Sequence, residues 1–406
     1  MHRLSSLLGF SLLLLSGTHL QAAPLEAAAI NEAEPGAFRE RLAEAEQKRA
    51  QKPDEAAKAQ KDPDTLPTED EARRAAEALT DPDPFLIRLQ VLLDRAHASP
   101  GVIDGLSGEN TVKAIRLFEE RRGLPVDGRV DDDVWQALTQ DSAPAVKTYE
   151  ITEKDVDGRY VKRIPTDYAE LAKLKWVGYR GVGEMLGERF HMGEGLLEAL
   201  NPDAKWTKAG TSVLVADPGP APEGLVTRIE VDKSRGEILA YGEDGTVIMT
   251  APATIGSEDT PSPSGDMKVE RVAHNPGYTY NPKKNFQQGK NKELLEIAPG
   301  PNGPVGSVWI ALTKPTYGIH GTPEPSKIDK TNSHGCVRLT NWDAEALAGI
   351  VEKERTEVHF LEEGQQPTGA TAQSGTTGSP SADTPAQPAA EAPPAGATNG
   401  GGSQPG

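Results

Sequence analysis

Hydrophobic residues recur at helical spacing in an early part of the chain. The intervals within Leu86–Leu93, Val112–Gly123 and Val134–Leu138 place apolar side chains on one face of a short helix in each case. Two turn-forming pairs, Asp104-Gly105 and Asp127-Gly128, stand before the second and third of these runs. Because three short helices can share one core, the pattern predicts a small three-helix domain over residues 85–141.

The pattern over residues 147–217 predicts a second, α+β segment. Two short helical runs are followed by a closing strand, at Gly183–Met192, Leu196–Pro202 and Ala209–Val215. Tyr149–Thr152 offers an opening strand, although a long stretch that contains Pro165 separates it from the first helix. His191 is interpreted as a surface residue rather than a ligand.

Runs rich in β-formers dominate after a Pro- and Gly-rich linker at Asp217–Gly224. The predicted strands are Val226–Val231, Glu237–Tyr241, Thr246–Thr250, Met267–Val272, Val308–Leu312 and Glu357–Phe360, and a helix is predicted at Trp342–Val351. Short turns join the first three strands as hairpins. Residues 225–361 are therefore expected to form a mainly β domain with one helix near its end.

The remaining segments contribute little to a core. Residues 1–23 carry the apolar run Leu7–Leu15 and end in Gln21-Ala22-Ala23, which predicts a secretory signal peptide. A retained membrane anchor is the alternative, but the run is shorter than the roughly 20 residues of a membrane span. Residues 24–84 are expected to be a charged spacer, helical or disordered, with a partner-binding helix as the alternative. Residues 364–406 are expected to be a disordered tail or flexible tether.

Charge and cysteine content narrow the class of protein. The 61 acidic and 43 basic residues give a net charge of -18, which argues against nucleic acid or an anionic membrane surface as partner. One cysteine permits no internal disulfide, so an exported chain of this composition must be stabilised by packing. The thiol of Cys336 is then free to react.

The chemistry-bearing stretch runs from Tyr317 to Leu339. Cys336 is preceded by His320-Gly321 and, immediately, by Ser333-His334-Gly335, and it is followed by Arg338. An imidazole can take the proton of a neighbouring thiol and so activate it as a nucleophile. By spacing alone, either histidine can act as the base.

The arrangement His320-Gly321, then Ser333-His334-Gly335-Cys336-Val337-Arg338, resembles the active-site signature of L,D-transpeptidases, which remodel bacterial peptidoglycan. The resemblance extends over residues 225–361 and includes Thr260–Gly265. It implies that Cys336 forms a thioester with a stem peptide and that His320 donates and accepts the proton.

The other roles are assigned from the chemistry of the residue types. His334 is expected to serve the oxyanion or the substrate. Gly335 and Cys336 provide backbone N–H donors, and the carbonyl of Gly321 orients His320. Tyr317, Ser333 and Arg338 are assigned to substrate binding, although an Arg338 that merely holds the loop to an acidic residue is the alternative. We expect no metal and no cofactor.

Two upstream segments resemble wall-binding modules. Leu89-Gln90, Gly101–Gly105, Gly108–Thr111, Phe118 and Gly123-Leu124 are similar to the pattern of a three-helix peptidoglycan-binding domain. The Leu200-Asn201-Pro202 turn and the following strand resemble the second half of a LysM module. The chain is thus expected to be a multidomain periplasmic enzyme with peptidoglycan as partner and possible transfer to an envelope protein. A hydrolase on the same scaffold and a non-catalytic wall-binding scaffold are the alternatives.

Overall fold

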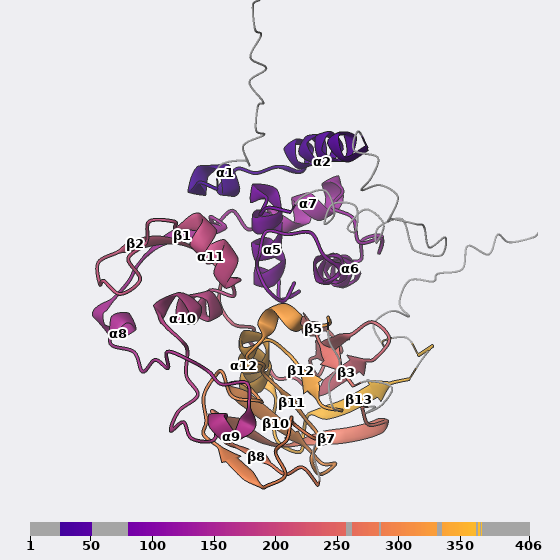
Figure 1. Cartoon of the computed structure of the whole chain (residues 1–406). Helices are drawn as coiled ribbons and strands as arrows, with labels where there is room; N and C mark the ends of the chain where they lie inside the picture. Colours follow the sequence, from indigo (N-terminus) through magenta and orange to yellow (C-terminus); the bar gives the residue numbers. More distant parts are fainter. Residues whose placement is uncertain are drawn as a thin grey trace, which may run out of the picture. The chain divides into compact units, whose positions relative to one another are not determined.

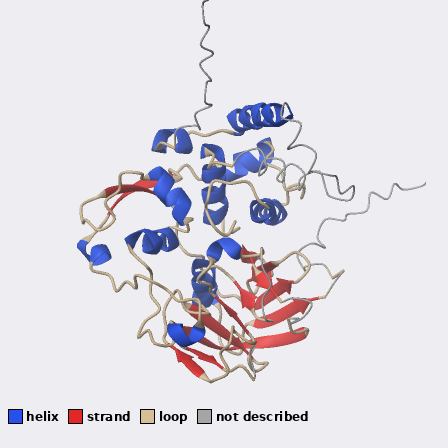
Figure 2. Cartoon of the chain, in the orientation of Figure 1, coloured by secondary structure: helices blue, strands red, loops and turns tan. Residues whose placement is uncertain are grey.

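The computed structural model describes residues 25–256 except 51–79, and then 262–283, 286–330, 335–362, 364–365 and 367, with the side chains of 46–50 left out. Helices prevail in the earlier part of the chain and strands gather in the last part (Figure 2). The predicted signal peptide and most of the predicted tail lie outside the described residues. Within the described residues, no helix is both long enough and apolar enough to cross a membrane.

Three helices form the predicted helical module: α5 (Pro84–Arg95), α6 (Glu109–Arg122) and α7 (Asp132–Leu138). Their apolar faces meet in one core that includes Leu89, Ile115 and Phe118. Helix α6 ends at Gly123, whose φ of 66° is the left-handed conformation that closes many helices. The sequence prediction for these helices is confirmed.

The segment predicted as a spacer begins with two packed helices, α1 (Ala27–Asn31) and α2 (Pro35–Ala50). Ile30 is fully buried, and the ring of Phe38 stacks on Phe85 with 4.9 Å between centroids. Arg41 donates two hydrogen bonds, of 2.7 and 2.8 Å, to the carboxylate of Asp83. Helix α2 agrees with the helical form of the predicted spacer. Ile30 and Phe38 nevertheless pack against other parts of the chain, which isolated apolar residues in a charged stretch do not indicate.

The second module is built on a two-stranded antiparallel sheet. Strand β1 (Val146–Glu150) pairs with β2 (Ser212–Ala216), and α10 (Val182–Arg189) and α11 (Glu194–Leu200) lie between them in sequence. The two helices and the sheet share a buried core. The long connection from β1 to α10 contains two short helices, α8 (Glu153–Val156) and α9 (Tyr168–Leu171), which the sequence did not predict.

The third module holds a nine-stranded mixed sheet. In sheet order the strands are β5 (Val247–Pro252), β4 (Glu237–Tyr241), β3 (Arg228–Asp232), β13 (Glu357–Leu361), β7 (Gly265–His274), β10 (Val308–Leu312), β11 (Gly318–His320), β12 (Val337–Arg338) and β6 (Thr254–Ile255). The pairs β3–β13 and β11–β12 are parallel and the other neighbours are antiparallel. Helix α12 (Asn341–Ile350) packs into the main core of this sheet, and β8 (Tyr278–Tyr280) pairs separately with β9 (Leu295–Ile297). The mainly β prediction is confirmed.

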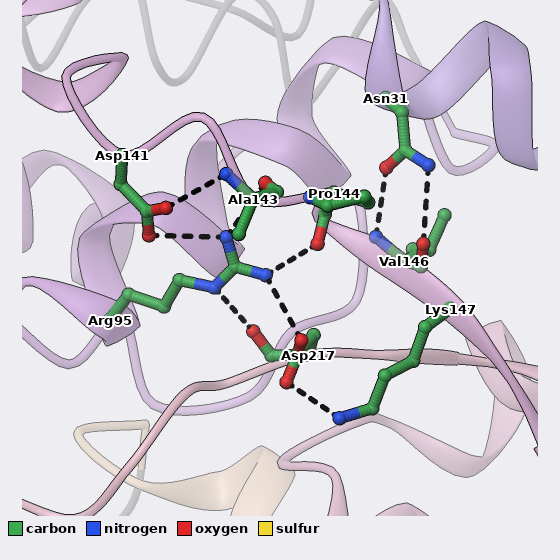
Figure 3. A network of polar contacts seen from close by, with 8 residues as sticks. All are labelled: Asn31, Arg95, Asp141, Ala143, Pro144, Val146, Lys147 and Asp217. Carbon is green, nitrogen blue, oxygen red and sulfur yellow. Dashed lines mark hydrogen bonds and ion pairs between the residues drawn. The ribbon is translucent and has the colours of Figure 1, made fainter.

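Arg95, the last residue of α5, joins the helical module to the second module (Figure 3). Its guanidinium donates to the carbonyl oxygen atoms of Ala143, Pro144 and Asp217, at 2.9, 2.5 and 2.7 Å. The side chain is only 6 % exposed, and the carboxylates of Asp141 and Asp217 lie 3.2 and 3.5 Å from it. One buried cation thus holds the connection into β1 and the end of β2 together.

His191 lies where all three modules meet, so its interpretation as a surface residue is corrected. Its Nδ1 lies 2.6 Å from Oδ2 of Asp94 on α5, and its ring stacks on Trp342 of α12 with 5.3 Å between centroids. One residue further along α12, the carboxylate of Asp343 accepts a hydrogen bond of 3.1 Å from Ser99. The contacts of His191 are with residues far away in sequence, so no local sequence pattern indicates them.

Candidate active site

Cys336 directly precedes β12 and follows a glycine with an unusual backbone conformation. Gly335 has a φ of 100°, a conformation that side-chain-bearing residues rarely adopt. The hydroxyl of Ser262 donates a hydrogen bond of 2.9 Å to the carbonyl oxygen of Gly335. The Cys336 side chain itself is partly exposed. Ser262 therefore holds the backbone next to Cys336, and the thiol is left partly exposed.

The parallel pairing of β11 with β12 sets the position of the thiol relative to His320. Ile319 lies opposite Val337 and His320 opposite Arg338, so Cys336 comes next to Gly318, at the beginning of β11. The Sγ atom of Cys336 lies 3.7 Å from the carbonyl oxygen of Thr316, which it faces as a donor. Residues sixteen apart in sequence are thus brought onto neighbouring strands.

His320 is held by a backbone carbonyl and by an aromatic ring. Its Nδ1 lies 2.7 Å from the carbonyl oxygen of Gly321. A carbonyl oxygen only accepts hydrogen bonds, so Nδ1 carries the proton and Nε2 is the basic nitrogen of the neutral ring. The ring also stacks on Trp309 of β10, with 5.4 Å between centroids and an interplanar angle of 20°. The imidazole therefore has a fixed tautomer and a fixed plane.

Asn341, the first residue of α12, supports the backbone beside His320. Its Oδ1 accepts a hydrogen bond of 3.0 Å from the amide of Ser307, and its Nδ2 donates one of 3.2 Å to the carbonyl of Pro301. A Cβ atom at Gly321 would lie 2.2 Å from that Oδ1, and one at Gly306 would lie 2.1 Å from it. Glycine at these two positions lets the amide approach the chain that orients His320.

The electrostatic environment favours the neutral forms of His320 and Cys336 at physiological pH. Burial lowers the pKa of His320 to about 4, and the positive charge of Arg338 acts in the same direction. Burial raises the pKa of the Cys336 thiol, against the opposing effects of the Gly318 amide and of Arg338. A neutral imidazole is the protonation state that a general base requires before it accepts a proton.

Three tyrosines and a phenylalanine form an aromatic cluster close to these residues. Tyr278 and Tyr280 belong to β8, Phe286 follows β8, and Tyr168 comes from α9 of the second module. The ring of Tyr168 meets those of Tyr278, Tyr280 and Phe286 edge to face, with 6.0, 5.3 and 6.1 Å between centroids. Edge-to-face contacts of this kind are favourable.

The other predicted site residues fall into two groups. Tyr317 and Arg338 are partly buried near the cysteine, and Lys314 lies over the Tyr317 ring at 4.7 Å from its centroid. Ser333 and His334 lie outside the described residues, as do Thr260 and Pro261. Among the residues that the structure describes, no cluster of three or more His, Cys, Asp or Glu side chains is arranged to hold a metal ion.

Sequence reasoning missed the structural partners of the site. Ser262, Trp309 and Asn341 each contact a residue of the predicted site or the backbone that holds it. Ser262 lies in the predicted Thr260–Gly265 segment, but no pattern marks its hydroxyl. Trp309 is placed by the pairing of β10 with β11, and Asn341 by the packing of α12 against the chain before β10, and the sequence displays neither contact.

Comparison with known proteins gives two family matches. Residues 226–360 match the family described as the L,D-transpeptidase catalytic domain, and residues 83–138 match the one described as a putative peptidoglycan binding domain. The first match contains Cys336 and His320, and the second covers α5, α6 and α7.

Several curated proteins are similar in sequence. The putative L,D-transpeptidase YkuD of Bacillus licheniformis is 32% identical over 144 residues, which cover 35% of this chain and 70% of the relative. The protein of the same name from Bacillus subtilis is 31% identical over 144 residues, covering 35% and 71%. The probable L,D-transpeptidase YbiS of Escherichia coli is 28% identical over 186 residues, covering 44% and 60%.

Proposed function

This chain belongs to the L,D-transpeptidase family, and we propose that Cys336 is the nucleophile with which it opens and re-forms peptide bonds in peptidoglycan. One observation carries the assignment. The parallel pair β11–β12 brings Cys336 next to the strand of His320, whose Nδ1 is fixed by the Gly321 carbonyl and whose Nε2 is free of a proton.

In the first half-reaction, Sγ of Cys336 attacks the carbonyl carbon between the third stem residue and the terminal D-alanine. Nε2 of His320 takes the thiol proton as the carbon–sulfur bond forms. The tetrahedral intermediate then expels the D-alanine amine, which receives that proton from His320. The product is a thioester on Cys336.

The negative charge on the tetrahedral oxygen must be stabilised by hydrogen-bond donors directed at it. The backbone N–H groups of Gly335 and Cys336 are assigned that role. Ser262 supports the assignment, because its hydrogen bond to the Gly335 carbonyl fixes the peptide plane in this loop. His334 and Ser333, by their place in the sequence, are assigned contacts to the substrate or the oxyanion.

Arg338 and Tyr317 are assigned to binding the donor stem peptide. A guanidinium can pair with a peptide carboxylate through two parallel hydrogen bonds. Arg338 lies opposite His320 in the sheet, so a carboxylate bound there would stand beside the reacting carbonyl.

In the second half-reaction an amine attacks the thioester and gives a proton to His320. His320 passes this proton to the departing sulfur, so Cys336 is regenerated as a thiol. A diaminopimelate amine yields a 3→3 cross-link, a lysine of an envelope protein yields a tether, and a free D-amino acid yields exchange. We infer cross-linking of peptidoglycan as the main outcome, with an envelope protein as a second class of acceptor.

The upstream modules are assigned to holding the polymer. The helical module matches a peptidoglycan-binding domain, so peptidoglycan is a partner of this chain. The β1–α10–α11–β2 order and the antiparallel β1–β2 pair support a LysM-like second module. Binding of the same polymer by two modules raises the local concentration of stem peptides at Cys336. The apolar run at Leu7–Leu15 supports export to the periplasm.

Purified sacculi incubated with the full chain test this function. Muropeptide analysis is expected to show new 3→3 dimers and free D-alanine with the wild type, and neither with Cys336→Ala. Shortened stems without new dimers would show a hydrolase instead. A covalent carbapenem adduct that persists in Cys336→Ala would overturn the nucleophile.

A further inference from the structure

A loop of the second module reaches the third module beside the reacting residues. This loop, residues 161–179, is called the strap, and its ends meet where the amide of Val161 donates to the carbonyl of Tyr179 at 2.8 Å. It carries α9 at its tip. Figure 1 shows α9 next to β8 and separated from the β1–β2 sheet of its own module.

The returning arm of the strap is bonded to the segment after β9. The amide of Val177 donates to the carbonyl of Pro299 at 2.9 Å, and the amide of Asn302 donates to the carbonyl of Val177 at 3.0 Å. The side chain of Asn302 also donates to the carbonyl of Gly178 at 3.1 Å. Gly300, with a φ of 144°, lets the chains touch, since a Cβ atom there would lie 2.2 Å from the Val177 carbonyl oxygen.

The tip of the strap is bonded to the segment between β8 and β9. The amide of Tyr168 donates to Oε1 of Gln288 at 3.2 Å, and Nε2 of Gln288 donates to the carbonyl of Thr166 at 2.9 Å. The side chain of Asn291 donates to Asp167 at 3.2 Å. Together with a small apolar cluster that includes Leu171, Val177 and Ile297, these bonds seat Tyr168 among the aromatic residues of β8.

Tyr168 and Tyr278 lie within electrostatic reach of the proposed reaction centre. Burial raises the pKa of Tyr168, and the charge of Arg338 opposes this rise. Burial also raises the pKa of Tyr278, and Tyr168 and Cys336 raise it further. The charge of Arg338 opposes this rise too. Both tyrosine side chains remain partly exposed, so their rings are available to a bound molecule.

We propose that the strap completes the donor site and that Tyr168 is a substrate-positioning residue, which with Tyr278 forms an aromatic wall for the donor stem peptide. The peptide lies against the two rings with its carboxylate toward Arg338. This inference rests on the proposed function. It also means that residues 225–361 lack one wall of their own site, which the second module supplies.

The test uses the full chain with a soluble disaccharide tetrapeptide as donor, and it measures D-alanine release. Tyr168→Ala is expected to raise KM about tenfold with kcat changed less than about threefold, the size of effect expected for a lost aromatic contact. Tyr168→Phe keeps the ring and is expected to restore KM to within about threefold of the wild type. Trp176→Ala is the matched control, because Trp176 belongs to the strap but stacks on Arg159, at 5.4 Å.

Alkylation of Cys336 by iodoacetamide separates positioning from collapse of the site. The alkylation rate is expected to be the same in all four proteins, since this small reagent does not depend on binding to the aromatic wall. Tyr168→Leu, which retains apolar bulk, replaces the alanine variant if that variant does not fold. A wild-type KM in Tyr168→Ala or Tyr168→Leu overturns the role of the strap. A rise in KM no larger than that caused by Trp176→Ala overturns it as well. A wild type that releases no D-alanine overturns the proposed function instead.

Discussion

Acidification tests whether His320 is the buried base that the structure indicates. A histidine in water has a pKa of about 6.5, and burial with the nearby Arg338 charge lowers that of His320 to about 4. At pH 5.5 a pKa of 4 leaves about 97% of the imidazole neutral, whereas a pKa of 6.5 leaves only about 9%. Acylation of Cys336 should therefore be nearly as fast at pH 5.5 as at pH 7, and it should fall only near pH 4.

The assay is the initial rate of carbapenem acylation between pH 4 and 8, followed by intact-protein mass spectrometry. His320→Ala should slow acylation by about 10² to 10⁴-fold and abolish the inflection near pH 4. The matched control is His359→Ala, because His359 lies on β13 and pairs with Asp266, 2.6 Å away. A wild-type inflection at pH 6 to 7 would refute the argument from burial, and an unchanged rate in His320→Ala would assign the base to His334.

Two further predictions concern the contacts between modules. Burial raises the pKa of Asp343 to about 7, so its ionisation opposes folding increasingly between pH 4 and 7. Asp343→Asn should leave the free energy of unfolding unchanged near pH 4 and raise it by up to about 4 kcal/mol at pH 8. Urea denaturation at several pH values measures this. A difference in the free energy of unfolding between Asp343→Asn and the wild type that stays constant with pH would contradict this. Arg95→Ala should lower that free energy by about 3 kcal/mol, because it leaves Asp217 without its buried partner, whereas Lys147→Ala, at a half-exposed contact to the same carboxylate, should cost less than about 1 kcal/mol.

The elements that were predictable from the sequence are those with a long enough local pattern. The apolar spacing of α6 with its terminal Gly123, and the β-forming run of β4 between two turns, specify their structure within a few residues. Strands β11 and β12 are only three and two residues long, so neither displays a period. They form because other strands pair with them, β10 and β12 with β11, and β11 and the distant β6 with β12, and a single sequence does not display these pairings.

The site divides along the same line. Cys336 and His320 can be proposed from the sequence because their residue types stand in a specific arrangement with glycine. Asn341, Trp309 and Ser262 act through contacts across the fold, and asparagine after a threonine looks like ordinary helix capping. In the sequence the strap is only a long connection before α10, since nothing local around Tyr168 indicates a contact with β8.

The carbonyl of Gly321 has a consequence for how this enzyme tolerates mutation. In many thiol and serine enzymes the group behind the histidine is an Asp or Asn side chain, which one codon change can remove. A peptide carbonyl is supplied by every amino acid, so no substitution deletes it. What selection must preserve at position 321 is an empty volume, because any side chain there would begin 2.2 Å from Oδ1 of Asn341. Genetic damage to the orienting group therefore acts through steric displacement rather than through loss of an acceptor.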